Sequence, residues 1–128
     1  SLGFLVTADT YIGCAGYSLR FKGMEPGVND KVRVRDIVVH GSKFVNESTA
    51  RSGMVGNSYG CPAVPEAQSK KIIDAIKGGS VYFIYHPNEN YNNNSRILNA
   101  VINAELMFAT AIPMLNTADS TTIGIMPR

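Results

Sequence analysis

The chain has no long apolar run, no strong charge excess and few residues suited to metal binding or nucleophilic chemistry. No apolar stretch reaches the ~18 residues that would predict a transmembrane helix. The formal net charge is +2, and this mild basic excess makes no case for nucleic-acid binding. Only two cysteines and two histidines are present, so thiol and imidazole chemistry is confined to four positions.

Those four positions do not form a metal-binding pattern. They are Cys14, His40, Cys61 and His86. Zinc accepts these ligand types, but no C-x-x-C or H-x-x-x-H spacing joins any two of them, so we expect no metal and no cofactor. For Cys14 two alternatives stay open: a disulfide to Cys61, which would disarm that thiol or act as a redox switch, and a small buried side chain beside Gly13.

Length and turn chemistry predict a single domain over residues 1–128. At 128 residues the chain can bury one core but not two. Alternating or aromatic stretches bounded by Gly, Pro, Asn and Asp predict strands. We expect them at residues 3–7, 17–21, 31–40 and 80–85, the last buried in the sheet, with loops at 9–16 and 23–30 and a polar turn at 88–94. This pattern indicates a mainly β domain with helices, of the α+β class.

Helices are predicted at three places. Pro65 suits the first position of a helix and Gly78-Gly79 suits its end, which predicts a helix directly after the Cys61 loop. A helical turn is expected at residues 46–51. The apolar spacing of residues 95–112 predicts an additional C-terminal helix stopped by Pro113, followed by residues 116–128 as an added strand or a tail.

Cys61 lies in the sequence Asn57-Ser58-Tyr59-Gly60-Cys61-Pro62-Ala63. The preceding Gly lets the backbone turn tightly and approach a ligand, and the following Pro stiffens the exit. Buried structural cysteines usually have apolar neighbours, whereas the neighbours here are those of an ordered loop. The pattern therefore predicts a thiol that is presented for chemistry.

A cysteine nucleophile needs a base within hydrogen-bond reach, and His40 is the better of the two candidates. His40-Gly41 ends an apolar strand pattern, where the ring can be held in one orientation, whereas His86 precedes Pro87 in an Asn-rich loop. A free thiol is mostly protonated at neutral pH, so His40 would remove its proton during attack.

Two further roles follow from this chemistry. The backbone N–H groups of Gly60 and Cys61 are candidate oxyanion donors, because Pro62 has no N–H. A third group should orient His40, and position allows the backbone of Gly41 or Ser42 or the Ser58 hydroxyl.

The motifs around these residues resemble the L,D-transpeptidase catalytic domain, a family of bacterial cell-wall cross-linking cysteine enzymes. The main signature is His40-Gly41 followed by Ser58-Tyr59-Gly60-Cys61, in the branch with a Gly-Cys-Pro-Ala segment. Further similarity lies in Ser1-Leu2-Gly3-Phe4, Gly16-Tyr17-Ser18-Leu19-Arg20, Gly23-Met24-Glu25-Pro26-Gly27 and Gly78-Gly79-Ser80. The resemblance covers residues 1–86 and leaves 87–128 as a C-terminal extension. It implies an L,D-transpeptidase-like β-sandwich.

The resemblance also implies a function. Cys61 would attack the third residue of a peptidoglycan stem peptide, expel the terminal D-Ala and form a thioester. An amine of a neighbouring stem or water would then resolve the thioester, giving a transpeptidase or an L,D-carboxypeptidase. The implied partners are stem peptides, with a carbapenem as inhibitor, in a periplasmic or otherwise extracytoplasmic location. Among the candidates that orient His40, the resemblance favours Ser58.

Four residues are candidates for substrate binding: Gly41, Arg51, Asn57 and Tyr59. Arg51 can bind the substrate's carboxylates or remain a solvated loop residue, and Tyr59 can line the cleft or pack. Two departures from the family bear on this. Related sequences carry an Arg just before the motif Ser or shortly after the Cys, where this chain has Asn57 and Ala63. The family domain also begins with additional strands, so either this chain was processed or trimmed, as Ser1 in place of Met indicates, or those strands are absent.

Two other function classes stay open at this point. One is a different Cys-His amide hydrolase, such as a peptidase or amidase. The other is a catalytically incomplete peptidoglycan-binding relic, which the missing arginine and the missing N-terminal strands favour. A covalent carbapenem adduct at Cys61 would separate the transpeptidase from both.

Overall fold

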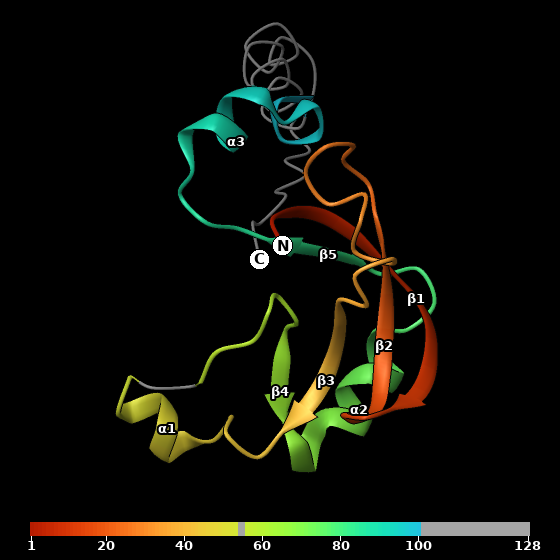
Figure 1. Ribbon diagram of the computed structural model, residues 1–128, viewed down its shortest axis with the longest axis vertical. Helices are drawn as coiled ribbons and strands as arrows, with labels where there is room; N and C mark the ends of the chain where they lie inside the picture. The colour runs from red at the N-terminus through yellow and green to blue at the C-terminus, as the bar shows by residue number, and fades with distance from the viewer. Residues whose placement is uncertain (54–55, 101–128) are drawn as a thin grey trace, which may run out of the picture.

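The computed structural model describes residues 1–53 and 56–100 (Figure 1). Its elements in chain order are β1 (Gly3–Gly13), β2 (Gly16–Gly23), β3 (Val38–Ser42), α1 (Glu47–Arg51), β4 (Ala63–Pro65), α2 (Glu66–Ile76), β5 (Val81–Ile84) and α3 (Glu89–Asn94). A further helical segment covers residues 96–100. The expectation of a mainly β domain with helices, of the α+β class, is confirmed.

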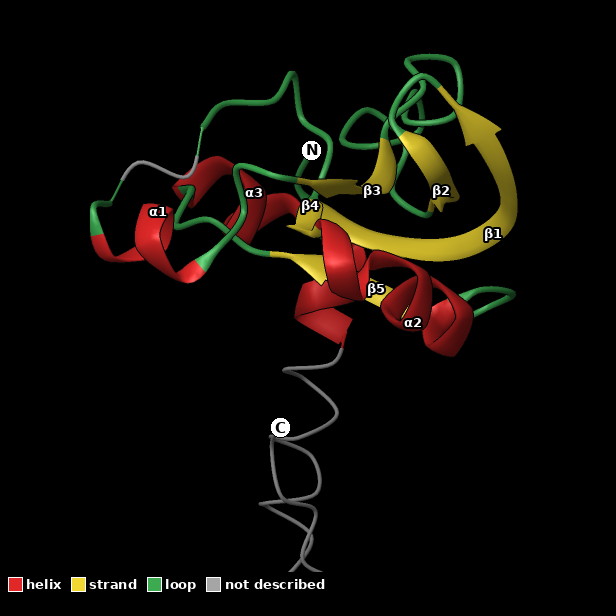
Figure 2. Ribbon diagram, turned by 90° about the horizontal axis from the view of Figure 1, so that it is seen from below, coloured by secondary structure: helices red, strands yellow, loops and turns green. Residues whose placement is uncertain are grey.

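The strands form one five-stranded sheet in the order β4-β3-β2-β1-β5. β3 and β4 run parallel, and every other neighbouring pair is antiparallel. β1 is long and strongly curved (Figure 2), and only its first half pairs with β5. In the described residues the sandwich expected from the family resemblance takes the form of this single curved sheet. β4 and β5 are its two edges.

α2 covers one face of the sheet and completes the core. Ile73 of α2 is fully buried together with Leu19 of β2 and Val39 of β3. Leu19 and Val39 are register partners, and side chains alternate between faces along a strand. Their neighbours Ser18 and His40, which are also register partners, therefore face away from α2.

The helices predicted around the Cys61 loop are confirmed. α2 follows Pro65 directly, and after its end the N–H groups of Gly78 and Gly79 donate to carbonyl oxygens of β1. The helical turn expected at 46–51 is α1, whose capping residue Asn46 accepts a hydrogen bond from the Thr49 N–H. Within residues 1–53 and 56–100, no helix combines the length and apolar character needed to cross a bilayer.

The strand predicted at residues 31–40 is wrong over its first part. Residues 31–36 form successive turns, in which the Arg35 N–H donates to the Lys31 carbonyl and the Ile37 N–H donates to the Val32 carbonyl. The apparent alternation there is not a sheet face, because Val34 is 89% exposed. Local hydrogen bonds satisfy this backbone instead of a ladder, and the strand begins at Val38.

Three other boundaries also differ from prediction. β1 continues to Gly13 through the loop expected at 9–16, because it pairs with β2 across a tight turn. Residues 88–94 hold α3 rather than a polar turn, because Asn88 caps a helix there by accepting from the Tyr91 N–H. β5 is an edge strand with Val81 exposed, not a strand buried in the sheet. β4 was not predicted at all.

The described part of the C-terminal extension is tied to the domain through Glu25. Its carboxyl group is buried and accepts hydrogen bonds from the Phe4 N–H at 2.7 Å, the Tyr91 hydroxyl at 3.0 Å and the Ser95 hydroxyl. Of the helix predicted at 95–112, residues 96–100 are helical. The remainder, with Pro113 and residues 116–128, lies outside the described residues.

A cluster of charges joins α2 to β2 and predicts acid sensitivity. The Lys70 and Lys77 ammonium groups and the Tyr17 hydroxyl bond the Asp74 carboxylate and hold its pKa well below the usual value of 3.8. In the unfolded chain this carboxyl takes up a proton more readily, so the stabilisation is present above about pH 4 and is lost as the pH falls further. We expect the free energy of unfolding of Asp74→Asn to fall less than that of wild type between pH 5 and pH 3.

Urea unfolding at a series of pH values measures how the free energy of unfolding changes with pH. Glu66→Gln, which alters an exposed carboxylate at the start of the same helix, is the control and should follow wild type. An equal loss of unfolding free energy between pH 5 and pH 3 in wild type and Asp74→Asn would contradict the prediction.

Candidate active site

His40 is held on the open face of the sheet by β3. It is half-buried and pairs with Ser18 of β2 on one side and with Ala63 of β4 on the other. Its Nδ1 lies 2.9 Å from the Gly41 carbonyl oxygen. A carbonyl only accepts, so this contact assigns the proton of the neutral ring to Nδ1 and leaves the Nε2 lone pair free to act as a base.

Gly41, the residue after His40, packs closely against α2. A Cβ at this position would lie 2.8 Å from Ser69 Oγ, 2.9 Å from Ser69 Cβ and 3.2 Å from Glu66 Cα, so α2 leaves no room for a side chain. The sequence placed Gly41 among the substrate-binding candidates. The structure shows it packed against α2, with its carbonyl oxygen on the His40 ring.

We therefore expect Gly41→Ala to reduce both stability and activity. Overpacking of this kind costs about 1–3 kcal/mol, and any shift of β3 also moves the imidazole. Urea unfolding and a thiol-dependent activity assay measure the two effects, with Ser69→Ala as a control, since it changes the facing side chain of α2 without adding a Cβ to β3. A Gly41→Ala protein with wild-type activity would contradict this role.

The parallel pairing of β3 and β4 brings the Cys61 loop next to His40, which lies in the middle of β3 rather than at the strand end expected from the sequence. The His40 N–H donates to the Pro62 carbonyl at 3.3 Å, and β4 begins two residues after the thiol. The Cys61 side chain is half-buried against the core and its thiol is free. Its Sγ lies 3.7 Å from the carbonyl oxygen of Asp36, to which the S–H can donate.

Asp36 is the part of this site that sequence reasoning missed. Its φ of 54° makes it the sole non-glycine residue with a positive φ in the described part of the chain. This left-handed conformation, which Asp tolerates better than most residues, ends the turns at 31–36 and aims the Asp36 carbonyl at the thiol. An Asp directly before the apolar strand pattern was the available signal, but it points to a turn and not to a contact with Cys61.

Ser58 and Gly60 form a closed hydrogen-bonded loop around Cys61. The Ser58 hydroxyl donates to the Cys61 carbonyl at 2.7 Å and accepts from the Gly60 N–H at 3.2 Å. Gly60 has a φ of 119°, which strongly favours glycine. Two expectations change as a result. The contact to the His40 ring comes from Gly41 rather than Ser58, and the Gly60 N–H is engaged by Ser58, which leaves the Cys61 N–H as the oxyanion candidate.

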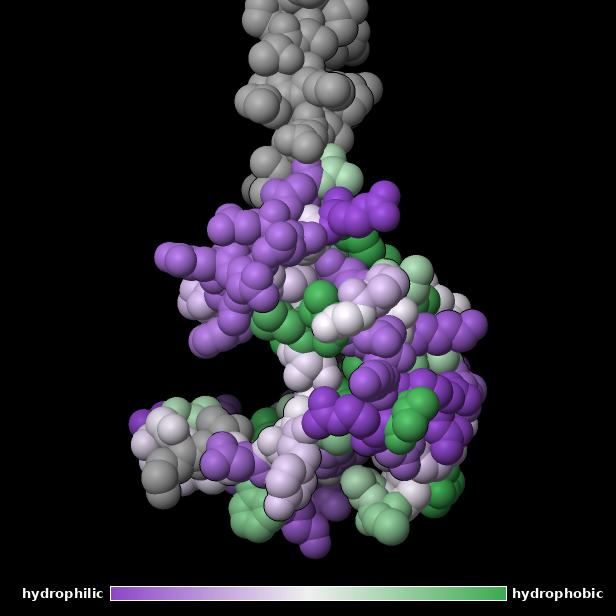
Figure 3. All heavy atoms as spheres, turned by 45° about the horizontal axis from the view of Figure 1, so that its top comes forward, coloured by the Kyte–Doolittle hydropathy of each residue, from purple (hydrophilic) through white to green (hydrophobic). Residues whose placement is uncertain are grey.

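Two cavities meet at Cys61. The smaller, of about 240 Å³, is lined by Cys61 together with His40, Ser42, Asn57 and Ser58. The larger, of about 480 Å³, lies between the 58–62 loop and the residues of β5. The space-filling view shows a hollow between the segment that carries α1 and the rest of the molecule (Figure 3). Cys61 and His40 therefore open on one shared cavity, as a nucleophile and its base require.

The remaining substrate-binding candidates differ in whether they line a cavity at Cys61. Asn57 lines the smaller cavity. Arg51 lines neither cavity and instead pairs with Glu47 of α1 at 3.3 Å, its side chain 82% exposed. Tyr59 is 97% exposed, and its carbonyl accepts from Arg35 at 3.4 Å.

A charged cluster lies on the same face as His40. Tyr11 and Ser18 are register partners, so Tyr11 belongs to the row that runs through Ser18 to His40. Arg20 stacks over the Tyr11 ring at 3.7 Å and pairs with Asp9 at 2.9 Å. Hydrogen bonds from Arg33 and then Arg20 hold the pKa of Asp9 well below its usual value. Burial, followed by the Asp36 carboxylate, raises the pKa of Tyr11.

The structure contradicts both alternatives expected for Cys14. Cys14 is an exposed free thiol in the β1–β2 turn, so it is neither buried beside Gly13 nor joined to Cys61. In residues 1–53 and 56–100 no three His, Cys, Asp or Glu side chains are grouped closely enough to hold a metal ion.

Cys61 and His40 thus line one cavity on a curved mixed sheet. A family model for the L,D-transpeptidase catalytic domain matches residues 1–85. The chain belongs to this family. No curated protein and no solved structure matches the chain.

Proposed function

We propose that this protein is a peptidoglycan L,D-transpeptidase in which Cys61 is the nucleophile and His40 the base. The observation that carries the proposal is that both residues line one cavity while the Gly41 carbonyl fixes the tautomer of His40. Family membership supports a transpeptidase-type enzyme. The substrate is the stem peptide of peptidoglycan, which implies an extracytoplasmic location.

The first half-reaction acylates the thiol. Sγ of Cys61 leaves its contact with the Asp36 carbonyl, transfers its proton to Nε2 of His40 and attacks the carbonyl carbon of the third stem residue. The Cys61 N–H stabilises the oxyanion that forms on the carbonyl oxygen. The bond to the terminal D-Ala nitrogen then breaks, His40 returns the proton to that nitrogen, and a thioester remains.

The second half-reaction restores the thiol. An amine of a neighbouring stem, or water, attacks the thioester carbonyl while His40 accepts its proton. The C–S bond breaks and the sulfur recovers a proton from His40. An amine acceptor gives a cross-link between third residues, and water gives a shortened stem. The choice depends on which group the cavity beside His40 admits.

Release of D-alanine from a synthetic tetrapeptide stem tests the proposal. A transpeptidase yields D-alanine together with a cross-linked dimer detected by mass spectrometry. D-alanine without dimer assigns the same site to an L,D-carboxypeptidase. If the folded protein releases no D-alanine and forms no acyl-enzyme, the proposal fails, and the peptidoglycan-binding relic or an unrelated Cys-His hydrolase replaces it.

A further inference from the structure

The carbonyl of Asp36 and the thiol of Cys61 meet because two parallel strands begin at the same end of the sheet. Asp36 lies two residues before β3 and Cys61 lies two residues before β4 (Figure 1). Sγ of Cys61 is 3.7 Å from the Asp36 carbonyl oxygen, within reach of a weak S–H donor. His40 lines the same cavity, yet in the described part of the chain the thiol is bonded to Asp36 and not to the imidazole. The resting thiol is therefore not engaged with its base.

The Asp36 carbonyl is held in place by the turn that carries it. The Ile37 N–H donates to the Val32 carbonyl at 2.9 Å, and the Asp36 N–H donates to the Arg33 carbonyl at 3.2 Å. Val32 and Ile37 are both buried and belong to the hydrophobic core, so the turn is anchored at both of its ends. The carbonyl is thus a fixed acceptor.

The loop that carries the thiol is fixed as well. The Ser58 hydroxyl donates to the Cys61 carbonyl at 2.7 Å and accepts from the Gly60 N–H, which closes the loop around the cysteine. A Cβ at Gly60 would lie 3.4 Å from Cδ1 of Ile37, so this loop packs against the residue that follows Asp36. Because both backbones are held, rotation about the Cα–Cβ bond of Cys61 is the motion that moves Sγ away from the carbonyl.

The contact with Asp36 opposes reaction. In this contact the sulfur keeps its proton, whereas a cysteine nucleophile reacts after giving its proton to a base. The thiol must therefore turn from Asp36 to His40 before it reacts. A bound peptide can offset the lost hydrogen bond with its own contacts in the cavity, but a small electrophile makes too few contacts to do so.

We infer that Asp36 is a positioning residue whose carbonyl holds the Cys61 thiol protonated and unreactive until a substrate displaces it. The inference rests on the proposed function in taking Cys61 as the nucleophile and His40 as its base, and it adds selectivity against small electrophiles. The backbone of Asp36 carries this role. Its side chain is 64% exposed, with Oδ1 3.9 Å from Nε of Arg20, and an ion pair of this kind is too weak to fix the carbonyl.

Alkylation by iodoacetamide tests this role without a stem peptide. In this reaction Sγ bonds to the methylene carbon, iodide leaves, and the thiol proton goes to Nε2 of His40. All variants carry Cys14→Ala, which leaves Cys61 as the sole cysteine of the chain. We expect Asp36→Ala to be alkylated about two- to tenfold faster than this parent, the equivalent of one hydrogen bond. The reason is that alanine disfavours the φ of 54° and so withdraws the carbonyl.

Two conservative variants separate the carbonyl from the carboxylate. Asp36→Gly and Asp36→Asn both lose the charge but keep a residue that adopts a positive φ, so their alkylation rates should stay within about twofold of the parent. A third comparison separates positioning from loss of fold. Adding His40→Gln to the parent and to Asp36→Ala should make their rates equal, because the released thiol needs its base, whereas a thiol exposed by local unfolding does not.

Three results would overturn the positioning role: no acceleration in Asp36→Ala, equal acceleration in all three Asp36 variants, or an acceleration that survives His40→Gln. The tetrapeptide assay on the parent protein reports the proposed function separately. D-alanine release by a parent whose alkylation rate is unchanged in Asp36→Ala overturns this inference alone. The predicted alkylation rates without any D-alanine release overturn the proposed function alone.

Discussion

Replacing His40 with glutamine is expected to slow acyl-enzyme formation about 10²- to 10⁴-fold, the usual contribution of a general base. Glutamine retains a polar side chain of similar reach but cannot accept and return a proton. Nδ1 of His40 lies 2.9 Å from the Gly41 carbonyl oxygen, which leaves Nε2 free to accept a proton, and His40 lines the same cavity as Cys61. Stopped reactions followed by intact-protein mass spectrometry measure the rate.

His86→Gln provides the control, because His86 is exposed and lines neither cavity at the thiol. Its acylation rate should stay within about twofold of wild type, as for a surface substitution. Equal rates for wild type and His40→Gln, or equal losses in both variants, would remove His40 from the mechanism. Denaturation curves for both variants separate loss of base from loss of fold.

Removing the buried carboxyl group of Glu25 is expected to lower the free energy of unfolding by about 1–3 kcal/mol for each buried donor left without its acceptor. Glu25→Ala leaves the Phe4 N–H, the Tyr91 hydroxyl and the Ser95 hydroxyl without their acceptor. These donors come from β1, α3 and the residue after α3, so the variant should also release the C-terminal segment. Urea unfolding gives the stability, and hydrogen exchange at residues 89–95 reports the release.

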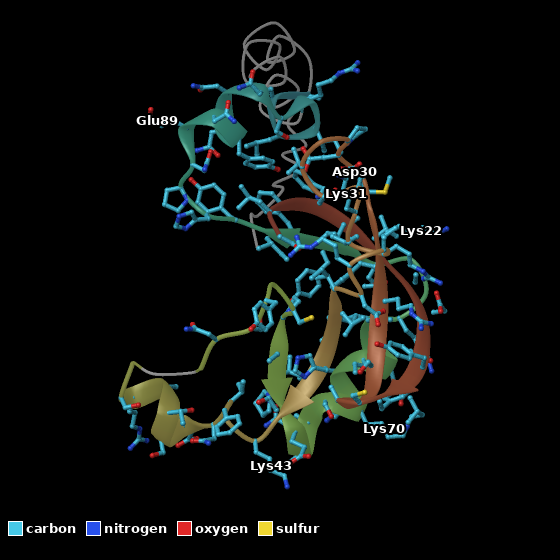
Figure 4. All side chains as sticks on the ribbon, viewed as in Figure 1. Lys22, Asp30, Lys31, Lys43, Lys70 and Glu89 are labelled. Atoms are coloured by element: carbon cyan, nitrogen blue, oxygen red, sulfur yellow. The ribbon has the colours of Figure 1, made fainter. Side chains whose placement is uncertain are left out.

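Glu89→Ala is the matched control in the same segment, since Glu89 projects outward from α3 (Figure 4). It should change the unfolding free energy by no more than about 0.5 kcal/mol. Glu25→Gln should lie between the two, because an amide oxygen still accepts while the amide nitrogen replaces one acceptor with a donor. A Glu25→Ala protein as stable as Glu89→Ala would show that this carboxyl group does not anchor the segment.

The sequence predicted those features that depend on residues close together in the chain. α2 carries its own start and stop signals in Pro65 and Gly78-Gly79, and the His40-Gly41 and Gly60-Cys61-Pro62 patterns mark a strand and a loop. The parallel pairing of β3 with β4 was not predicted, although it is what brings the two motifs together. β4 is only three residues long, and its pairing is fixed by the fold rather than by local propensity.

The features that prediction missed depend on contacts between distant parts of the chain. Residues 31–36 alternate like a strand but satisfy their backbone locally, and this turn delivers the Asp36 carbonyl to Cys61. Glu25 reads as part of a Pro-Gly turn, yet it is buried because partners about 70 residues later bond it. Arg51 was predicted from its charge alone, and its pairing within α1 keeps it out of both cavities.

Intact-protein mass spectrometry after incubation with a carbapenem tests the central claim most directly. The account predicts a single covalent adduct on reduced wild-type protein and none on Cys61→Ala, with Cys14→Ala as the matched thiol control that still forms the adduct. Such a result would establish an activated thiol at Cys61 in a site shaped for a stem-peptide mimic. An unmodified wild-type protein, or an adduct that persists in Cys61→Ala, would contradict the assignment of Cys61 as the nucleophile.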